Sequence, residues 1–460
     1  MKEYDIIVIG AGAGTKLVTP PSKIGKRVAV FEKETPGGTC LNRGCIPSKM
    51  VIYPSELIRL SEGTEKFPVF FKDKPVADVT QIFRRVSETV KQDSDSIPIA
   101  YDKNPNIDYY PKQVRFIDNR ILSDGQETYT AKHIFIVTGT RPNIPDIPGL
   151  KTTPFWTSRE ALSPDKFPKS LLIIGAGFIS LELGAAYQAY GCQVTGLTRT
   201  DVLRSADGEI KNELNKHLPF PIEAHYQMKK VEFKDGLFTV TGKTAEGKST
   251  IHTAERLLVA TGIRPNTDDL GLEHTKIQTN ASGYIQVSNT LETTEPGIYA
   301  FGDVIGRFFF RHSANFEGEY LFDHLYGTKT NLPINYPPMP EAVFTHPQIA
   351  SVGYTEEELI QKQIPYYKGV NPYSSSATGM ARMSDSGFVK VLVSKETEQV
   401  IGVHIIGDEA ANLIHQILLG MYLKAKLDDY LGMIYIHPAI SEITRNAFRK
   451  VKEEKLKGTK

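Results

Sequence analysis

The sequence predicts an α/β protein in which one strand–turn–helix unit occurs twice. A glycine-rich turn at residues 10–15 follows the apolar run 4–9, and a second such turn at 175–180 also follows an apolar run. The pattern Thr-Gly-x-Arg-Pro-Asn then closes each unit, at 138–143 and again at 261–266. Strand, glycine turn and helix in this order are typical of a nucleotide-binding parallel sheet. The repeat therefore predicts two Rossmann-like dinucleotide-binding domains.

The first unit has the residues that a dinucleotide site needs. Gly10, Gly12 and Gly14 allow a pyrophosphate to approach the N-terminus of the helix that follows. Glu32 comes 22 residues after Gly10, at the end of the apolar run 28–31. An acidic residue at this distance binds a ribose hydroxyl. We therefore interpret the first unit as a dinucleotide-binding domain.

The same turn departs from the usual pattern in two places. Thr15 occupies the position of the last glycine, and Gly14 stands one residue earlier. Pro20 and Pro21 interrupt the expected helix, because proline lacks the backbone donor and clashes with the preceding turn. The helix after the first turn is therefore predicted to be kinked or short.

The second unit carries the residues that choose between NADH and NADPH. Gly175 and Gly177 form its turn, and its second strand ends at Thr198 and Arg199. An NAD site has an acidic residue there for the ribose diol, whereas arginine suits a 2′-phosphate. Arg204 supplies a second cation, so the strand favours NADPH. The alternative is that both arginines are solvated surface side chains.

Two cysteines follow the first unit within the segment 37–49. Cys40 and Cys45 are separated by four residues, which lets their thiols meet within about two helical turns. A helix N-terminus favours the thiolate and makes such a pair reactive. A structural disulfide and half a zinc site are the alternatives. Zinc ligands usually stand two to four residues apart, no second pair lies nearby, and the remaining cysteine is Cys192. No metal site is predicted.

A histidine near the C-terminus suits the chemistry of such a pair. His437 is followed five residues later by Glu442. Thiol–disulfide exchange needs a proton donor for the leaving thiol, and the pKa of histidine suits that task near neutrality. A carboxylate at this spacing can fix the imidazole tautomer. A purely structural His-Pro segment is the alternative, which the cysteine pair makes less favourable.

Beyond residue 335 the pattern changes to an α+β type. Alternating apolar residues at 388–393 and 400–406 predict an antiparallel strand pair. A helix is expected from about Ala410 to Lys426. The charged run 449–460 is interpreted as a solvated tail rather than a nucleic-acid arm.

The composition is that of a globular protein without a nucleic acid or membrane partner. The 460 residues are 40% hydrophobic and 23% charged, with a net charge of +1. Three cysteines in a chain of this length argue against a secreted disulfide scaffold. No signal peptide precedes the first strand, and no apolar run reaches the roughly 18 residues of a membrane span. The expected compartment is the cytoplasm.

The segment 37–49 closely resembles the flavoprotein disulfide reductases, and the resemblance extends along essentially the whole chain. This family includes dihydrolipoamide dehydrogenase, glutathione reductase, mercuric reductase and mycothione reductase. The resemblance implies FAD in the first unit, NADPH or NADH in the second, and a C-terminal α+β dimerisation domain. It also implies that residues 299–303 bring an aspartate to the ribityl chain of the flavin. The expected division is 1–148 and 272–334 for FAD, 149–271 for NAD(P), and 335–460 for a homodimer interface.

The resemblance further implies roles for individual residues. Cys40 and Cys45 are the active-site disulfide, with Cys45 facing the flavin as the charge-transfer thiolate and Cys40 exchanging with substrate. His437 is the acid/base and completes the active site of the other subunit, and Glu442 orients it. Lys49 and Glu182 pair beside the reactive nitrogen of the flavin, and Phe178 covers the isoalloxazine. The implied FAD contacts are Gly10, Gly12, Gly14, Glu32, Lys33, Thr39, Lys49, Thr138, Gly139, Gly302 and Asp303. The implied NAD(P) contacts are Gly175, Gly177, Phe178, Ile179, Glu182, Thr198, Arg199, Arg204 and Gly262.

The substrate is less clearly indicated than the chemistry. Ala439 and the run 311–317 resemble the mycothione reductase branch, whereas 41–42 and 46–49 match lipoamide dehydrogenases. We expect a low-molecular-weight disulfide reductase of mycothione-reductase type. Dihydrolipoamide dehydrogenase, with a lipoyl-bearing multienzyme complex as a further candidate partner, is the alternative. A flavin redox sensor without turnover is an alternative of another class, against which His437 argues.

Overall fold

The computed structural model describes residues 1–327 and 332–457. Its first sheet is formed by apolar runs that are buried on both faces. The sheet has seven strands in the order β3-β2-β1-β6-β5-β4, with β16 beside β6. They are β1 Lys2–Ile9, β2 Val28–Phe31, β3 Ile107–Tyr110, β4 Arg115–Asp118, β5 Ile121–Ser123, β6 Thr128–Ile136 and β16 Ile298–Ala300. β3, β2, β1, β6 and β16 pair in parallel. The segment around β16 thus returns to the first sheet from far downstream.

The second unit repeats this arrangement on a smaller scale. Its parallel sheet has the order β10-β9-β8-β14 and lies beside the antiparallel sheet β11-β12-β13. The strands are β8 Ser170–Ile174, β9 Gln193–Leu197, β10 Ile222–Glu223, β11 Gln227–Lys234, β12 Leu237–Lys243, β13 Ser249–Ala254 and β14 Arg256–Val259. β7 Thr140–Pro142 and β15 Ile263–Pro265 pair with each other, with Arg141 opposite Arg264. The two repeated Thr-Gly-x-Arg-Pro-Asn turns therefore meet.

The C-terminal part is an antiparallel sheet with helices. Its strand order is β17-β18-β21-β20-β19. The strands are β17 Pro340–Val343, β18 Ile349–Gly353, β19 Tyr366–Pro372, β20 Phe388–Ser394 and β21 Val400–Ile406. The pairing of β20 with β21 confirms the predicted antiparallel pair.

The α-helices have the following bounds in the described residues. They are α1 Thr19–Lys23, α2 Gly38–Arg43, α3 Cys45–Ser61, α4 Val79–Asp102, α5 Ser158–Ala161, α6 Phe178–Ala189, α7 Gly208–Lys216, α8 Arg311–Tyr326, α9 Glu356–Gln361, α10 Ala377–Ala381, α11 Ala410–Tyr422, α12 Leu427–Gly432 and α13 Glu442–Lys457. Short 3₁₀ turns are η1 Ala13–Leu17, η2 Thr64–Lys66, η3 Leu150–Thr152, η4 Leu272–His274, η5 Gly302–Ile305 and η6 Tyr373–Ser375.

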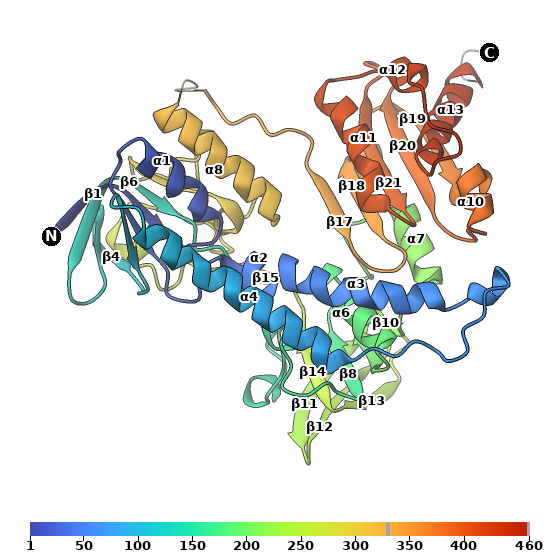
Figure 1. Ribbon diagram of the computed structural model, residues 1–460, viewed down its shortest axis with the longest axis horizontal. Coiled ribbons are helices and arrows are strands. Elements are labelled where there is room, and N and C mark those ends of the chain that lie inside the picture. The colour runs from blue at the N-terminus through green and yellow to red at the C-terminus, as the bar shows by residue number, and fades with distance from the viewer. Residues whose placement is uncertain (328–331, 458–460) are drawn as a thin grey trace.

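The prolines have the predicted effect after the first glycine turn. The chain forms η1 and then the five-residue α1, with Pro20 and Pro21 inside α1. Pro20 lies in the first turn of α1, where the missing donor costs least. α8 packs against η1 and contacts α1 (Figure 1).

Two C-terminal expectations are corrected by the structure. The helix expected over 410–426 ends at Tyr422, and α12 begins at Leu427. The interpretation of 449–460 as a solvated tail is corrected for 449–457, which is helical and belongs to α13: Val451 is buried on the side of β19, while most other side chains of this segment are exposed. The buried apolar side chains of α13 are Ile443, Ala447, Phe448 and Val451. Their spacing gives one apolar face, which the number of charges concealed. Residues 458–460 lie outside the described part.

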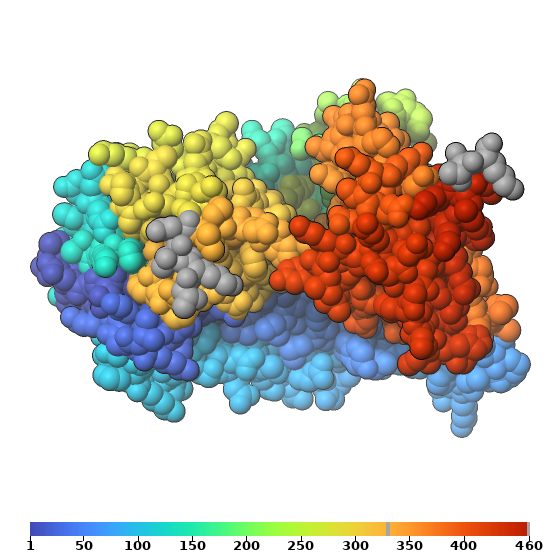
Figure 2. All heavy atoms as spheres, turned by 90° about the horizontal axis from the view of Figure 1, so that it is seen from above, coloured from blue at the N-terminus to red at the C-terminus, as the bar shows by residue number. Residues whose placement is uncertain are grey.

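The helix that begins at Cys45 packs against the second unit. Val51 and Ile52 of α3 share a core with Leu183 and Tyr187 of α6 and with Phe83 of α4. Figure 1 shows α4 running from the N-terminal sheet towards the second unit, and α3 lying between the second unit and the C-terminal part. Figure 2 shows the C-terminal residues as a block beside the N-terminal unit. The cysteine segment therefore lies where the parts of the chain meet.

A buried ion cluster joins the second unit to the C-terminal sheet. The ammonium nitrogen of Lys390, on β20, lies 2.9 Å from both carboxylate oxygens of Asp207. Glu356 at 2.6 Å and Glu209 at 2.7 Å complete the cluster. The side chains of Lys390 and Asp207 are 1% and 0% exposed. Asp207 also accepts a hydrogen bond from the backbone of Glu209, so the cluster fixes the start of α7.

No helix within 1–327 or 332–457 is both long and apolar enough to cross a membrane. The same residues contain no group of three or more histidine, cysteine or acidic side chains arranged to hold a metal ion.

Candidate active site

A cavity of about 1400 Å³ runs between the first unit, the second unit and the C-terminal sheet. It is lined by many of the residues that the sequence singled out. These are Gly10, Gly12, Glu32, Lys33, Thr39, Cys40, Cys45, Lys49, Thr138, Gly139, Phe178, Ile179, Glu182, Gly302 and Asp303. Gly14, Gly175, Gly177, Thr198, Arg199, Arg204, Gly262, His437 and Glu442 are not among its lining residues.

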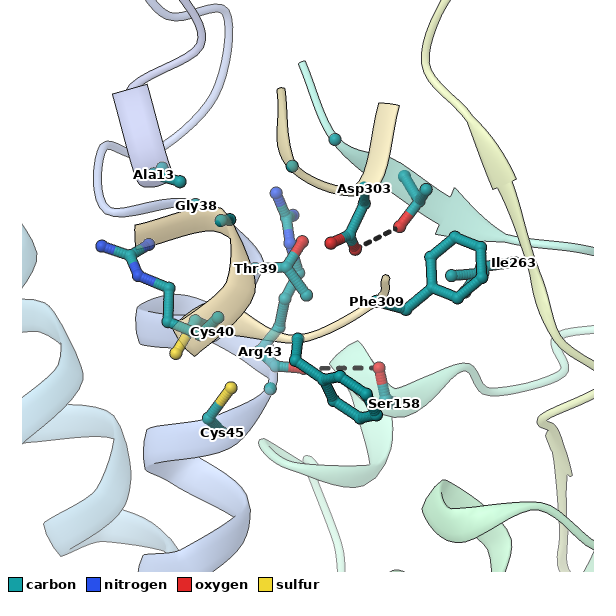
Figure 3. A pocket seen from close by; sticks show the side chains of 18 of the residues that line it. Ala13, Gly38, Thr39, Cys40, Arg43, Cys45, Ser158, Ile263, Asp303 and Phe309 are labelled. Atoms are coloured by element: carbon teal, nitrogen blue, oxygen red, sulfur yellow. Dashed lines mark hydrogen bonds between the residues drawn. The ribbon is translucent and has the colours of Figure 1, made fainter. Parts of the chain in front are cut away.

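The two cysteines face each other across the junction of α2 and α3 (Figure 3). Cys40 lies in α2, and Cys45 is the first residue of α3. Their pKa values describe the pair as two free thiols. The hydrogen bond from Cys40, together with the charges of Lys49 and Arg311, lowers the pKa of the Cys45 thiol to about 7. The hydrogen bond to Cys45 and burial raise the pKa of Cys40. Cys45 is therefore the thiolate of the pair near neutral pH.

Lys49 and Glu182 come together from different units. Lys49 Nζ lies 2.7 Å from Glu182 Oε2, and the backbone N–H of Phe344 donates to Oε1 at 2.9 Å. The Lys49 ammonium also lies 4.3 Å from the centroid of the Phe344 ring. Phe178, one turn before Glu182 on α6, keeps 47% of its surface exposed in the cavity. The ion pair thus fixes the floor of the cavity next to Cys45.

The glycine turns approach the neighbouring backbone closely in both units. Gly10 has φ +110°, and a Cβ there would lie 2.4 Å from the carbonyl oxygen of Val137. Gly175 has φ +111°, and a Cβ there would lie 2.2 Å from the carbonyl oxygen of Ala260. Both carbonyls directly precede the repeated threonine turns. Only glycine fits at these points, because each turn packs directly against the backbone that precedes the threonine turn.

The first unit fits FAD along the length of the cavity. The backbone N–H of Ala11 donates to Glu32 Oε2 at 2.8 Å, and burial raises the pKa of Glu32. At the other end, Thr140 donates to Asp303 at 3.0 Å, and burial raises the pKa of Asp303 (Figure 3). Acceptors at both ends and a glycine cradle between them suit the ribose, pyrophosphate and ribityl groups of one extended dinucleotide.

The second unit presents an open turn for a pyridine nucleotide. Gly177 is the N-cap of α6 and has no side-chain cap, so the first backbone donors of this helix remain available. Thr198 is buried, and its hydroxyl accepts from the backbone of Thr200 at 3.3 Å. Arg199 and Arg204 are exposed, and neither forms an ion pair within the described residues. Thr198 shapes the loop while the two arginines extend into solvent.

His437 and Glu442 form a pair at the surface of the C-terminal part. His437 Nδ1 lies 2.8 Å from Glu442 Oε2, and the two side chains are 70% and 5% exposed. Burial acts to raise the pKa of Glu442, but His437 and Arg445 hold it below its ordinary value. Glu442 thus stays ionised and fixes Nδ1, which leaves Nε2 free for proton exchange. Within one chain, this pair does not line the cavity of the cysteines.

Sequence reasoning missed three residues of this cavity. Thr140 lies in a turn that the repeat identified, but its bond to Asp303 is visible only in the fold. Phe344 lies in a segment that resembles the family's dimerisation domain, which gives no indication of its contact with Lys49. Arg311 was noted only within a stretch typical of one branch. Thr140 could have been identified from the sequence, because it directly follows Gly139, an expected FAD contact.

Comparisons with known proteins agree with this arrangement. The family model described as pyridine nucleotide-disulphide oxidoreductase matches residues 4–318, and the model of its dimerisation domain matches 339–448. Mitochondrial dihydrolipoyl dehydrogenase 1 of Arabidopsis thaliana is 30% identical over 97% of this chain and 90% of its own. The mitochondrial dihydrolipoyl dehydrogenase of Dictyostelium discoideum is 32% identical over 97% and 94%. Among solved structures, the HOCl-induced flavoprotein disulfide reductase RclA from Escherichia coli has a TM-score of 0.85 at 25% identity, covering 97% of this chain and 99% of that one. The predicted fold class is confirmed.

Proposed function

Since the chain belongs to the pyridine nucleotide-disulphide oxidoreductase family, we propose that it reduces a small disulfide with electrons from NADPH, as an enzyme of mycothione-reductase type. It is an FAD- and NAD(P)-dependent oxidoreductase acting on sulfur groups and carries the family's dimerisation domain. The observation that best supports disulfide chemistry is the cysteine pair at the cavity wall, in which the pKa of Cys45 is lowered to about 7.

Each cysteine has its own task in the proposed reaction. The Cys40 thiol, once deprotonated, attacks one sulfur of the substrate disulfide; a mixed disulfide forms and the first thiol leaves. The Cys45 thiolate then attacks the Cys40 sulfur, which releases the second thiol and leaves the Cys40–Cys45 disulfide. Bound FAD supplies the two electrons that it receives from the pyridine nucleotide and thereby restores both thiols. Lys49, held by Glu182, keeps a positive charge beside Cys45 throughout.

The proton donor comes, in this proposal, from a second subunit. The exposed Nε2 of His437 accepts the proton of the Cys40 thiol and gives it to the first leaving thiolate, and a proton from solvent passes through the same nitrogen to the second. Glu442 holds the imidazole in the required tautomer. We also propose the FAD and NAD(P) contacts and the four-part division of the chain as the sequence predicts them. The position of His437 outside the cavity of its own chain supports a homodimer with shared sites.

An anaerobic titration tests the redox chemistry directly. We expect NADPH to reduce the FAD-loaded protein by two electrons and to produce the long-wavelength absorption of a thiolate beside oxidised flavin. This follows from the lowered pKa of Cys45, which keeps it ionised above about pH 7. NADH is expected to give the same spectrum at higher concentration. Reduction straight to the four-electron level, without that band, would contradict the proposed relay.

Dihydrolipoamide oxidation by NAD⁺ is the second candidate. It is favoured by the relatives named dihydrolipoyl dehydrogenase. Turnover of lipoamide, mycothione and other small disulfides in parallel distinguishes the two. A preference for dihydrolipoamide with NAD⁺ would replace the first proposal by the second. A flavin sensor would turn over none of them.

The coenzyme preference is tested at the end of β9. We expect Arg199→Glu to move the ratio of kcat/KM for NADPH to that for NADH towards NADH by about tenfold to a hundredfold, because a charge-assisted bond to the 2′-phosphate is replaced by repulsion. Steady-state kinetics with both coenzymes measures the ratio. Lys229→Glu is the control, since it makes the same charge change on β11. An unchanged ratio in Arg199→Glu would show that the strand has been misinterpreted.

A further inference from the structure

Every lysine and arginine on the cavity wall except one is paired with a carboxylate. Within the described residues, Arg311 lines the cavity without any ion pair or side-chain hydrogen bond. The other six cations are all matched. Their pairs are Lys33–Asp269, Arg43–Glu34, Lys49–Glu182, Lys112–Asp124, Arg141–Asp268 and Arg159–Glu34.

An unpaired guanidinium on a partly buried wall is costly unless an anion joins it. Arg311 is half-buried at the start of α8, so its charge is only partly solvated. Glu341 lines the same cavity but forms no ion pair with it, and burial raises the pKa of that carboxyl. The wall therefore offers one positive charge that no carboxylate of residues 1–327 or 332–457 neutralises.

This charge lies beside the reactive sulfurs. Arg311 lines the same cavity as Cys40 and Cys45, and its positive charge acts to lower the pKa of both thiols, against the larger effects that raise the pKa of Cys40. Its neighbour His312 stacks on Phe310 and bonds to the carbonyl of Pro340 at 3.0 Å. Burial lowers the pKa of His312, so this imidazole is neutral at pH 7 and adds no competing cation.

We propose that Arg311 binds the negative charge of an anionic disulfide substrate beside the cysteine pair. The guanidinium presents several donors in a plane, and a carboxylate can accept two of them at once. The substrate class is then a small disulfide with a carboxylate, or a similar anion, near its sulfur atoms. This inference rests on the proposed reduction of a small disulfide, but not on the identity of that disulfide.

Two alkylating agents of nearly equal size test the inference without turnover. Iodoacetate carries a negative charge and iodoacetamide none, and both react with the same thiolate. In the FAD-loaded, dithiothreitol-reduced enzyme, the ratio of their rates is measured by peptide mass separately at Cys45, the thiolate of the pair, and at Cys40. Any effect of Arg311 on thiol acidity cancels in the ratio. We expect Arg311→Met to lower the ratio by about tenfold, and Arg311→Lys to keep most of it.

Arg159→Met is the matched control, because Arg159 lines the same cavity but is already paired with Glu34. Its ratio is expected to stay at the wild-type value. An equal fall in Arg159→Met would show a general effect of cavity charge and overturn the inference. So would an unchanged ratio in Arg311→Met, even if both rates fall, since Arg311 would then act on the thiols alone.

Turnover of three disulfides extends the test to substrates. The probes are 3,3′-dithiodipropionate, bis(2-hydroxyethyl) disulfide and cystamine, which are negative, neutral and positive at similar length. The wild type is expected to prefer the anion by about tenfold in kcat/KM, and Arg311→Met to lose that preference. Equal losses for all three probes would overturn the inference. If the wild type reduces none of them or any other disulfide, the proposed function fails, while the alkylation ratio still decides the role of Arg311.

Discussion

Replacing Cys45 by serine is expected to abolish disulfide turnover, by roughly a thousandfold or more, while FAD stays bound. The reaction needs Cys45 as the sulfur that resolves the mixed disulfide, and a hydroxyl cannot form that bond. The measurement is kcat with the best small disulfide, beside the flavin spectrum of the purified variant. Residues that act as one relay lose nearly all activity when any member is removed.

Diaphorase activity provides the internal control for this variant. Artificial acceptors can take electrons from bound FAD directly, so Cys45→Ser should retain that activity. Cys192→Ser is the matched cysteine control, because Cys192 is buried away from the cavity and should leave both activities unchanged. Substantial disulfide turnover by Cys45→Ser would exclude the assigned relay.

Mixing two inactive variants should restore activity if the site is shared between subunits. Cys40→Ser removes the attacking thiol and His437→Ala removes the proton donor. In a mixed dimer, one site combines an intact Cys40 from one chain with an intact His437 from the other. Up to half of the sites in that dimer should therefore regain turnover. The measurement is disulfide reduction after the subunits have been exchanged and the mixed dimer has been verified by two different tags.

The position of His437 in the structure is the reason for this experiment. His437 is 70% exposed and does not line the cavity of its own chain. Large exposed apolar side chains precede it in the chain, namely Met433, Ile434 and Ile436. If verified mixed dimers stay as inactive as their parents, His437 works within its own chain or has no part in the reaction.

The sequence predicted those parts of the fold in which one local pattern determines the structure. The glycine turns, their flanking strands and the repeated threonine turns depend on neighbours in the chain, and each formed as expected. The short helix at Pro20 and Pro21 follows from proline geometry alone. The family resemblance predicted the cofactor set, which spacing alone leaves open.

The parts that could not be predicted depend on partners far away in sequence. The charges of 449–457 concealed the apolar face of α13, whose partner strand β19 lies about eighty residues earlier. Arg311 is a similar case. Arg311 stands out only because the six other cationic side chains of the cavity wall form ion pairs. A sequence does not show which charged side chains are paired in the fold.

The buried cluster of Lys390 with Asp207, Glu356 and Glu209 limits how this protein can be recombined. Lys390 belongs to the C-terminal sheet and Asp207 to the nucleotide unit, so neither part is a self-sufficient module. A chimera that exchanges only one of them, for a sequence lacking the matching charge, leaves an ion buried without its partner. Breaking such a pair costs about 3–5 kcal/mol, a large fraction of the stability of a typical domain. Coenzyme specificity is therefore better transferred by exchanging residues 193–204 within β9 and its loop than by exchanging the whole nucleotide unit.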